Sequence, residues 1–485
     1  MNIQKIISAK LLKLCYICFI FHTLVYISCN KDIEVSSSVA RAPQISPSYA
    51  GLIIPPNIAP LNFAIEEAAT QYYIEIGEIN QNPTIHYLQK DSIVKINQKH
   101  WRKLLQQAKG GVIYFRIYLK RDNKWIQMAD ILNVVANQEI DQYLVYRLLY
   151  PGYELWNEMG IYQRELSSYK QIPIVENKSL EGSCVNCHTF ANNSPETMLL
   201  HIRGELGGTI LYRDGKTSKT DMTVGGMNNR GTYSSWHPDQ QHIAFSMNDV
   251  QQYFHFSGSK PIEVADKTSD LAIYDCQTNE IFTSPKISGE EQLETYPSWH
   301  PNGRVLYFCR AKKLNKNMPL DSILYDLYSV EIDVKSRTFG DPQCVYEASA
   351  LGKSVSFPRV SPDGRHLMLT LSDYGCFPIW HPESELALLD ISSNSLRILE
   401  EVNSDDVESF HSWSSSGDWF VFSSKRLDGL WARPFIAHFD KKTGLAGKPF
   451  ILPQKDPYFY DNFTKTYNLP ELITRPVKNV DFRKP

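Results

Sequence analysis

The sequence predicts an all-β chain in which a β-propeller follows a small β-sandwich-like domain. Three observations carry this prediction. The 485 residues include 27 Tyr, 22 Phe and 9 Trp, residue types that favour strands. One segment recurs four times, with steps of 63, 61 and 53 residues between its copies. Each copy joins a turn to an apolar strand, and a four-stranded propeller blade with its loops takes a comparable length of chain.

Each copy of the repeat places an aromatic residue three positions before an apolar anchor. A turn carrying Asp, Asn or Gly then leads into an apolar strand. Two of these turns are Asn-Gly and Asp-Gly, which are strong hairpin signals. A second strand ending in an acidic residue follows in every copy. The four anchors are Trp236, Trp299, Val360 and Trp413.

These copies resemble the W-S-P-D-G-x-x-I-A-F motif of the TolB-like six-bladed β-propellers, although the fourth copy lacks the Pro. The resemblance covers roughly residues 180–450. It implies six blades, while the repeat itself leaves five or seven open. Residues 143–150 and 160–175 are expected to supply outer strands of one further blade. The C-terminal segment would complete that blade and close the ring.

The N-terminal part shows strand patterns of a different kind. In Gly111–Lys120 apolar residues alternate with amphipathic ones, as in an antiparallel sheet with one solvated face. Further strands are expected at Gln71–Ile76, Thr84–Leu88 and Ile93–Ile96, and a short helix at Lys99–Lys109. The expected organisation is a signal segment (1–28), a flexible tether (29–48), an N-terminal β domain (49–138), the propeller (139–470) and a tail (471–485).

The first residues indicate export. Three lysines precede an apolar stretch, Leu14–Ser28, that is typical of a secretory signal. Tyr26-Ile27-Ser28-Cys29 resembles a bacterial lipobox, with Tyr26 where Leu is usual. This implies a lipid on Cys29, and Asn30-Lys31-Asp32 resembles the sorting signal of Bacteroidota lipoproteins. We therefore expect an outer membrane-anchored lipoprotein, facing the periplasm or the cell surface. The alternative is a plain signal peptide with an incidental Cys29.

One motif predicts a specific chemistry. Cys184-Val185-Asn186-Cys187-His188 has the C-x-x-C-H spacing that attaches a c-type haem, with two thioethers and the imidazole as proximal iron ligand. Two alternatives stay open. One is a structural Cys184–Cys187 disulfide beside an incidental His188. The other is a metal site of two thiolates and His188, for which no second C-x-x-C or H-x-x-x-H completes a zinc set. We expect the motif in the loop that enters the first blade.

A haem at this motif leaves room for a distal iron ligand. Met198 is the first candidate, since a methionine ligand raises the potential of electron-transfer cytochromes. His201 is the alternative candidate. On one strand the two side chains point to opposite faces, so only one of them could reach the iron. The plainer interpretations are Met198 as core filler and His201 as a surface residue.

Two further histidines occupy matched positions in the repeat. His237 and His300 each follow a Trp, where Ser361 and Ser414 stand in the other copies. A role in the turn backbone fits all four, and a metal ring is the alternative. No Ser-His-Asp spacing, carboxylate pair or phosphate-binding Gly loop stands out, so an enzyme is the weakest of three functional classes.

The leading functional hypothesis is an exported, membrane-anchored propeller that carries a haem for electron transfer or redox sensing, with an envelope or redox partner. The alternative is a TolB-like envelope scaffold for a protein or glycan, in which the cysteines form a disulfide. The net charge of −3 offers no basic surface for nucleic acid. The whole architecture resembles a group of Bacteroidota lipoproteins linked to TolB or to cytochrome c, which implies location and fold more than activity.

Overall fold

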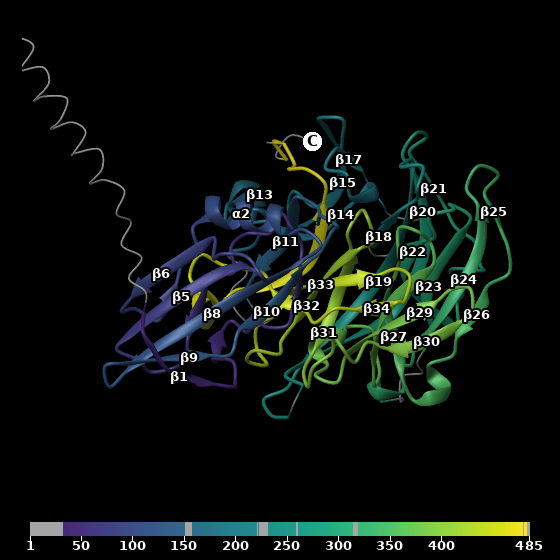
Figure 1. Cartoon of the computed structure of the whole chain (residues 1–485). Helices are drawn as coiled ribbons and strands as arrows, with labels where there is room; N and C mark the ends of the chain where they lie inside the picture. The colour runs from purple at the N-terminus through teal and green to yellow at the C-terminus, as the bar shows by residue number, and fades with distance from the viewer. Residues whose placement is uncertain are drawn as a thin grey trace, which may run out of the picture.

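The computed structural model describes residues 33–150, 158–220, 222, 231–258, 260–313, 319–478 and 480–482. The expected signal segment and Cys29 lie outside these residues. The described chain forms an N-terminal β domain beside a ring of sheets (Figure 1). In the part of the chain that the structure describes, no helix has the length and apolar character needed to cross a membrane.

The ring has six blades, which confirms the predicted fold. Its first blade is assembled from both ends of the propeller. β11 (Tyr143–Leu149), β12 (Gly160–Glu165) and β13 (Gln171–Glu176) are completed by the C-terminal strand β36 (Thr466–Ile473). β36 runs antiparallel to β11, from Tyr143 opposite Ile473 to Leu149 opposite Thr466. The chain therefore closes the ring by hydrogen bonding, in the way the sequence predicts.

Five antiparallel sheets complete the ring. The second consists of β14 (Cys184–Phe190), β15 (Thr197–Arg203), β16 (Gly208–Arg213) and β17 (Lys216–Thr220). The third blade has β18 (Thr232–Trp236), β19 (His242–Phe254), β20 (Ile262–Asp275) and β21 (Glu280–Phe282), and the fourth has β22 (Gln292–Trp299), β23 (Val305–Lys312), β24 (Asp326–Asp333), β25 (Thr338–Phe339) and β26 (Gln343–Tyr346). The fifth blade has β27 (Ser354–Val360), β28 (His366–Ser372), β29 (Glu385–Asp390) and β30 (Ser395–Ile398). The sixth blade has β31 (Glu408–Trp413), β32 (Trp419–Ser424), β33 (Arg433–Asp440), β34 (Leu445–Ala446) and β35 (Phe450–Ile451).

The innermost strands share one irregularity. These strands, β36, β14, β18, β22, β27 and β31, contact one another around the ring. Each loses register with its neighbour at one point, as in a β-bulge. In five blades the bulged residue has a φ between +46° and +51°, a conformation that costs L-residues roughly 1–2 kcal/mol. These five are Tyr233, Tyr296, Phe357, Phe410 and Leu469.

In the second blade the C-x-x-C-H motif fills this same bulge. The ladder between β14 and β15 breaks between Val185 and His188, so Asn186 and Cys187 occupy the bulged positions. Two expectations are corrected here. The motif lies in a strand, where we expected a loop, and in the second blade along the chain, where we expected the first. The reason is that residues 143–176 already supply three strands of a blade before the motif is reached.

The N-terminal domain has two sheets and one helix. A seven-stranded sheet packs with a three-stranded sheet, and α2 (Gln98–Gln107) begins at Asn97, whose side chain accepts two backbone N–H groups. The larger sheet holds β1 (Val35–Val39), β3 (Ile53–Ile54), β5 (Gln71–Glu78), β6 (Ile85–Gln89), β8 (Val112–Arg121), β9 (Lys124–Met128) and β10 (Ile131–Val135). The smaller sheet holds β2 (Ile45–Ser46), β4 (Phe63–Ile65) and β7 (Ile93–Val94).

Two expected segment boundaries differ from the structure. Within the expected tether 29–48, β1 pairs with β9 and β2 pairs with β4, so this stretch belongs to the domain. At the other end, β36 continues to Ile473, and Val477 and Phe482 of the expected tail are buried in an apolar cluster of the first two blades. Backbone pairing and apolar burial hold both segments, although their composition is polar.

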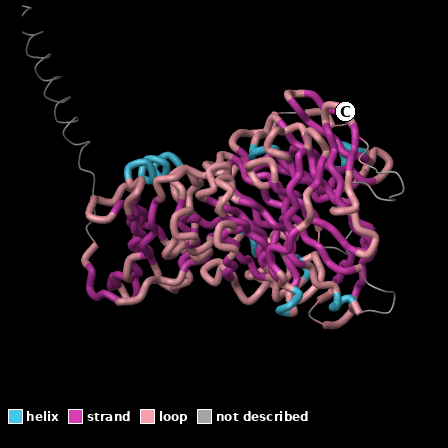
Figure 2. The backbone as a smooth tube through the Cα atoms, turned by 90° about the vertical axis from the view of Figure 1, so that its right-hand side faces the viewer, coloured by secondary structure: helices cyan, strands magenta, loops and turns pink. Residues whose placement is uncertain are grey.

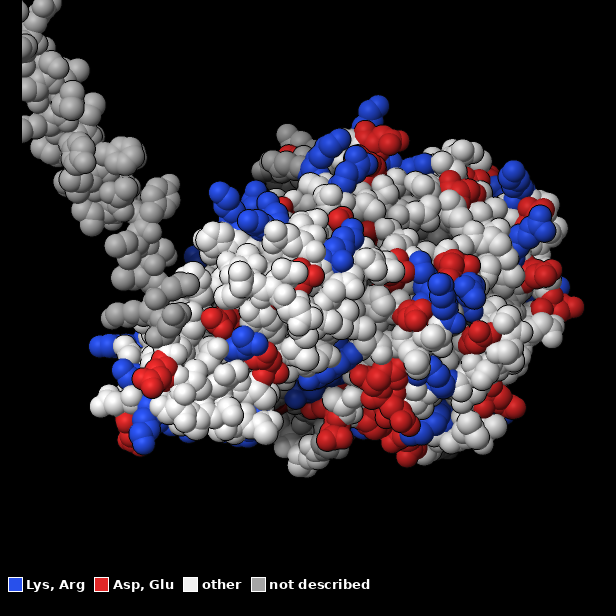
Figure 3. Space-filling model, viewed as in Figure 1, with Lys and Arg blue, Asp and Glu red and all other residues white. Residues whose placement is uncertain are grey.

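The N-terminal domain packs directly on the propeller. One apolar cluster joins residues of the domain to residues of the sixth and first blades. The Trp419 indole donates to the Gln138 carbonyl at 3.2 Å, and the Asn62 amide donates to the Lys455 carbonyl at 2.9 Å. The two parts therefore lie side by side (Figure 2). On the face shown in Figure 3, basic and acidic side chains are interspersed, in keeping with the small net charge.

The repeated histidines tie neighbouring blades together. The His237 Nε2 lies 2.8 Å from the Gly303 carbonyl, and the His300 Nε2 lies 3.0 Å from the Gly364 carbonyl. Gly303 and Gly364 close the hairpin turns of the next blade with φ of +69° and +71°. Both histidines thus have the turn role that the repeat favours. A Cβ on Gly364 would lie 2.8 Å from the His300 ring.

We therefore predict that Gly364→Ala destabilises the protein more than Gly352→Ala does. Gly352 has a similar φ of +66°, and a Cβ added there would meet no atom within 4 Å. Its substitution therefore costs only the backbone strain, roughly 1–2 kcal/mol. Gly364→Ala adds a collision with His300, which we expect to cost about 1–3 kcal/mol more. Urea unfolding of both variants measures the difference. Equal losses would show that the His300 contact is relieved without cost.

Candidate functional site

The C-x-x-C-H strand lies at the centre of the ring. Cys184 and Cys187 are half-buried free thiols. Cys184 pairs with Arg203 of β15, and His188 pairs with Leu200. The bulge between them breaks the strict alternation of side chains that a regular strand would impose. The motif therefore presents its side chains from an irregular piece of backbone that faces the propeller axis.

His188 is buried without hydrogen bonds. The residue is 3% exposed, and neither ring nitrogen has a partner in the described structure. The ring packs edge-on against Phe190, with the centroids 6.0 Å apart. Burial lowers the pKa of His188 to about 3, and the nearby Arg147 guanidinium acts in the same direction. The imidazole is therefore neutral at pH 7, which is the form that binds metals.

Other unpaired polar atoms gather at the same place. Arg147 of β11 donates from Nη1 to the Asn186 Oδ1 at 3.0 Å, yet its Nε has no partner among the described residues. The Asn186 Nδ2 is likewise buried and without a partner there. Burial lowers the pKa of Arg147. Each unpaired buried group costs about 1–3 kcal/mol, so a cluster of them is typical of a site that holds a ligand.

A cavity of about 190 Å³ lies beside these residues. The bulged residues of several blades form part of its wall, which places it on the propeller axis. Three cationic side chains line it, Arg147, Arg203 and Lys425, and no Asp or Glu is among its described lining residues. The rest of the wall is largely aromatic or apolar. It includes Cys187, Tyr233, Phe357, Phe377, Trp380, Phe410 and Leu469.

The hairpin of β19 and β20 covers this cavity. Its strands are 13 and 14 residues long, and Val250, Gln252, Ile262 and Val264 of the hairpin line the cavity. Lys260 at the end of the hairpin reaches Glu383 of the fifth blade at 2.7 Å. The Tyr374 hydroxyl, also in the fifth blade, donates to the Glu263 carboxylate. These contacts hold the hairpin across the ring.

The donor set of the motif fits a c-type haem in its chemistry. Both thiols are free, the imidazole is neutral with both nitrogens unpaired, and cations that suit propionate groups line the cavity. The space is more restricted. Cys187 lines the cavity and His188 does not, and its volume is close to that of a cavity of about 150 Å³ that takes a single benzene ring. The cavity itself therefore takes one ring, and a porphyrin attached at the motif would extend beyond it.

The two candidate distal ligands lie on β15. Met198 is fully buried and belongs to the apolar cluster that contains Val185 and Phe190. His201 lies on the opposite face of the strand, as alternation predicts. It is 2% exposed, with its Nδ1 3.5 Å from the Thr209 hydroxyl, so the expectation of a surface residue is wrong. Both faces of β15 are buried because neighbouring blades cover them.

The two alternatives to haem are a disulfide and a metal site. Cys184 and Cys187 are free thiols in the described structure. The two thiols and His188 do not form a metal set in the described chain, where one group of three ligand atoms lies within 4.8 Å, His237, Asp239 and His242.

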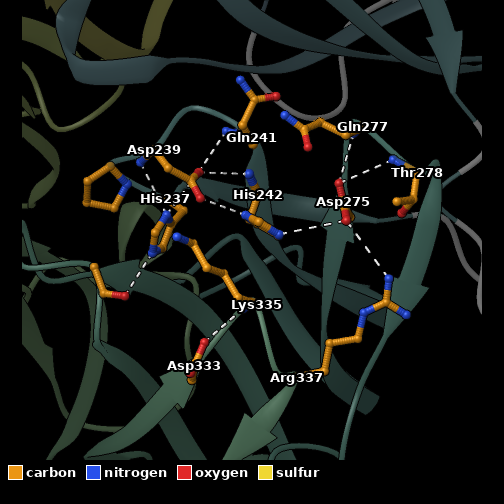
Figure 4. A network of polar contacts seen from close by, with 12 residues as sticks. His237, Asp239, Gln241, His242, Asp275, Gln277, Thr278, Asp333, Lys335 and Arg337 are labelled. Carbon is orange, nitrogen blue, oxygen red and sulfur yellow. Dashed lines mark hydrogen bonds and ion pairs between the residues drawn. The ribbon is translucent and has the colours of Figure 1, made fainter.

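That group forms a hydrogen-bonded turn (Figure 4). The Asp239 carboxylate lies 2.8 Å from the His242 Nδ1 and accepts the Gln241 backbone N–H at 2.7 Å. The His237 Nδ1 accepts the backbone N–H of Asp239 at 3.2 Å, while its Nε2 contacts the next blade. The atoms that a cation would use already hold the turn together. We therefore assign this cluster a structural role.

The sequence reasoning missed four charged residues of the site. Arg147, Arg203 and Lys425 line the cavity, and Glu471 of β36 accepts the Phe190 backbone N–H at 3.1 Å. A repeated sequence pattern could have identified Glu471. Asn468-Leu469-Pro470-Glu471 repeats the bulge pattern of Ser356-Phe357-Pro358-Arg359, so aligning it as a fifth copy places Glu471 at the same position as Arg359. His188 occupies this position in the second blade.

Comparisons with known proteins found solved structures of low similarity to this chain. No family model and no curated protein matches the chain. A putative TolB from Agrobacterium tumefaciens is 15% identical with a TM-score of 0.38, covering 68% of this chain and 98% of its own. An oligogalacturonate lyase from Vibrio parahaemolyticus is 12% identical with a TM-score of 0.32, covering 59% and 84%. A Mycobacterium tuberculosis puromycin-hydrolysing peptidase is 11% identical with a TM-score of 0.36, covering 86% and 57%. Similarity of this degree carries no argument about activity.

We predict that Glu471→Gln removes a decline of stability with rising pH. Burial raises the pKa of Glu471 to about 7, with Arg359 acting against it, while the unfolded value is about 4.5. Between these values the folded state holds the extra proton, so stability falls as pH rises from about 4.5 through 7. The variant loses this decline, on the order of 1–3 kcal/mol.

Thermal unfolding between pH 5 and 7.5 checks this. His188 and His411, whose pKa values are both lowered to about 3, contribute the opposite slope in every variant, so they cancel in the comparison. Glu205→Gln, at an exposed position, is the matched control. An unchanged slope in Glu471→Gln would contradict the raised pKa.

Proposed function

We propose that this chain is an exported, lipid-anchored propeller that carries a covalently attached c-type haem and serves electron transfer or redox sensing. The observation that carries the proposal is the placement of C-x-x-C-H in the axial bulge of the second blade, with free thiols and an unpaired, neutral imidazole. A buried histidine with two unpaired nitrogens is costly unless something binds it.

The residues of the chain have distinct roles in this proposal. Cys184 and Cys187 would form the thioethers, and His188 would be the proximal ligand, kept neutral by burial. When bound, the haem supplies a one-electron iron couple. Met198 is the first candidate for a distal ligand because it shares the apolar cluster of Phe190, and His201 is the alternative. Burial at the axis excludes water from the imidazole.

The location is part of the same proposal. Attachment of a c-type haem takes place outside the cytoplasm, and the lipobox-like sequence ending at Cys29 provides a membrane anchor. We place the protein at the outer membrane, facing the periplasm or the cell surface, with an envelope redox protein as partner.

A second candidate function is a binding scaffold of the envelope, for a protein or glycan partner. The axial cavity favours it, because a cavity with mostly apolar walls and a few polar groups is the usual form of a ligand site. As predicted from the sequence, this candidate includes a structural Cys184–Cys187 disulfide; both cysteines are free thiols in the described structure.

We predict that the protein matured in a host with c-type haem machinery shows a Soret band and gains one haem in intact mass. The colour should survive acid acetone because thioethers are covalent. Cys187→Ser should lower the covalent yield sharply, and His188→Ala should alter the spectrum while the haem stays attached. Cys344→Ser, at an exposed cysteine outside the site, is the control. A colourless protein of unmodified mass would overturn the haem and leave the scaffold.

A further inference from the structure

We propose that the axial cavity is a binding site for a carboxylate attached to a single aromatic or similarly flat apolar group. The inference goes beyond the haem proposal, since the cavity and its charges exist in the chain without any attached group. It rests on an unpaired buried ammonium, on the absence of acidic residues from the described wall, and on the size and aromatic lining of the space.

Lys425 is the first part of the argument. It follows the end of β32, is 7% exposed and lines the cavity, and no carboxylate or carbonyl is bonded to its ammonium in the described structure. Its ammonium lies over the Trp380 ring, with the ring centroid 4.7 Å from Nζ. Burial lowers the pKa of Lys425 to about 8, while Asp406 and Asp428 act against that shift. The group therefore remains largely protonated at pH 7.

Two guanidinium groups line the same space. Arg147 is hydrogen-bonded to Asn186, and its Nε is unpaired in the described structure, while Arg203 comes from β15. Arg203, which is otherwise exposed, repels the Arg147 guanidinium, and the acidic groups that act on Lys425, Asp406 and Asp428, lie outside the described wall. An anion inside the cavity would remove this repulsion and provide charge-assisted hydrogen bonds. A carboxylate matches the planar fork of a guanidinium.

The cavity wall and its volume indicate the size and apolar character of the group that carries the carboxylate. Tyr233, Phe357, Phe377 and Phe410 surround the cavity with aromatic surface, and the β19–β20 hairpin covers it. A volume of about 190 Å³ suits one ring, given that about 150 Å³ takes benzene. Sugars and long peptides do not match these apolar walls. The carboxylate has two sources, a free small molecule or a propionate of the attached haem, and the chemistry of the site is the same for both.

The test uses the full mature chain produced without haem machinery, titrated with benzoate and with its neutral isostere benzamide. We expect benzoate to bind at least tenfold more tightly by calorimetry. Lys425→Met keeps the apolar stem and removes the charge, so it should weaken benzoate about tenfold and leave benzamide unchanged. Lys442→Met, at an exposed position, is the matched control and should change neither affinity. If Lys425→Met does not fold, Lys425→Gln replaces it.

Equal affinities for the two probes, no benzoate binding, or an equal effect of Lys425→Met on both would overturn the inference. The titration is repeated on haem-loaded protein. If benzoate binding is lost in the haem-loaded protein, the cationic side chains of the cavity bind the haem propionates. If benzoate binding is retained, these side chains bind a free carboxylate. A protein that never takes up haem leaves the first titration intact, so the two proposals fail separately.

Discussion

The pairing of β36 with β11 is the interaction on which the rest of the structure depends. It joins residues 466–473 to residues 143–149 and turns an open series of sheets into a closed ring. Closure also builds the site. It brings Leu469 and Asn468 to the cavity wall beside Arg147, and it sets Glu471 against the backbone of Phe190. A propeller without this strand would leave β14 with one uncovered side and the cavity open.

The bulges on the inner strands are the second constraint. In five blades a bulky residue is held at positive φ, which is a strained conformation, and strain of this kind persists only where the surrounding packing enforces it. The bulges aim their side chains at the axis, where the Phe357 ring makes edge-to-face contacts with Tyr233 and Phe410. The second blade uses the same backbone device with different residues. Asn186, Cys187 and His188 stand where the other blades have an aromatic residue or Leu, then Pro, Ser or His, and then a polar or charged residue.

Much of the fold followed from local patterns, and the site followed only in part. The repeat of Trp236, Trp299, Val360 and Trp413 was legible because each blade buries the same face, and the strand alternation in Gly111–Lys120 matches the fully buried Ile113, Phe115 and Ile117 of β8. The motif was found by its spacing, yet its conformation was not. Three residues of spacing do not distinguish a loop from a bulged strand, because the difference is set by pairing with β15 and by β36, which lies about 280 residues away in the chain. Lys425 and Arg147 carry no local signal at all, since only ring closure brings them to one cavity.

The comparison of His188 with His411 locates what is unusual about the motif. Both rings are buried in inner strands, and burial lowers both pKa values to about 3, so both are neutral. The His411 Nε2 bonds the Met368 carbonyl at 3.0 Å, so its ring N–H has an acceptor and only a lone pair is left unpaired. Within the described structure, His188 has no acceptor for the proton that a neutral ring must carry, and orphaned buried N–H groups are rare in proteins. The fold thus supplies a hydrogen-bond acceptor for the buried ring of His411, and the described residues supply none for His188. Nothing among the described residues offsets the cost of burying His188, and this is the physical reason to look for a ligand at Cys184–His188.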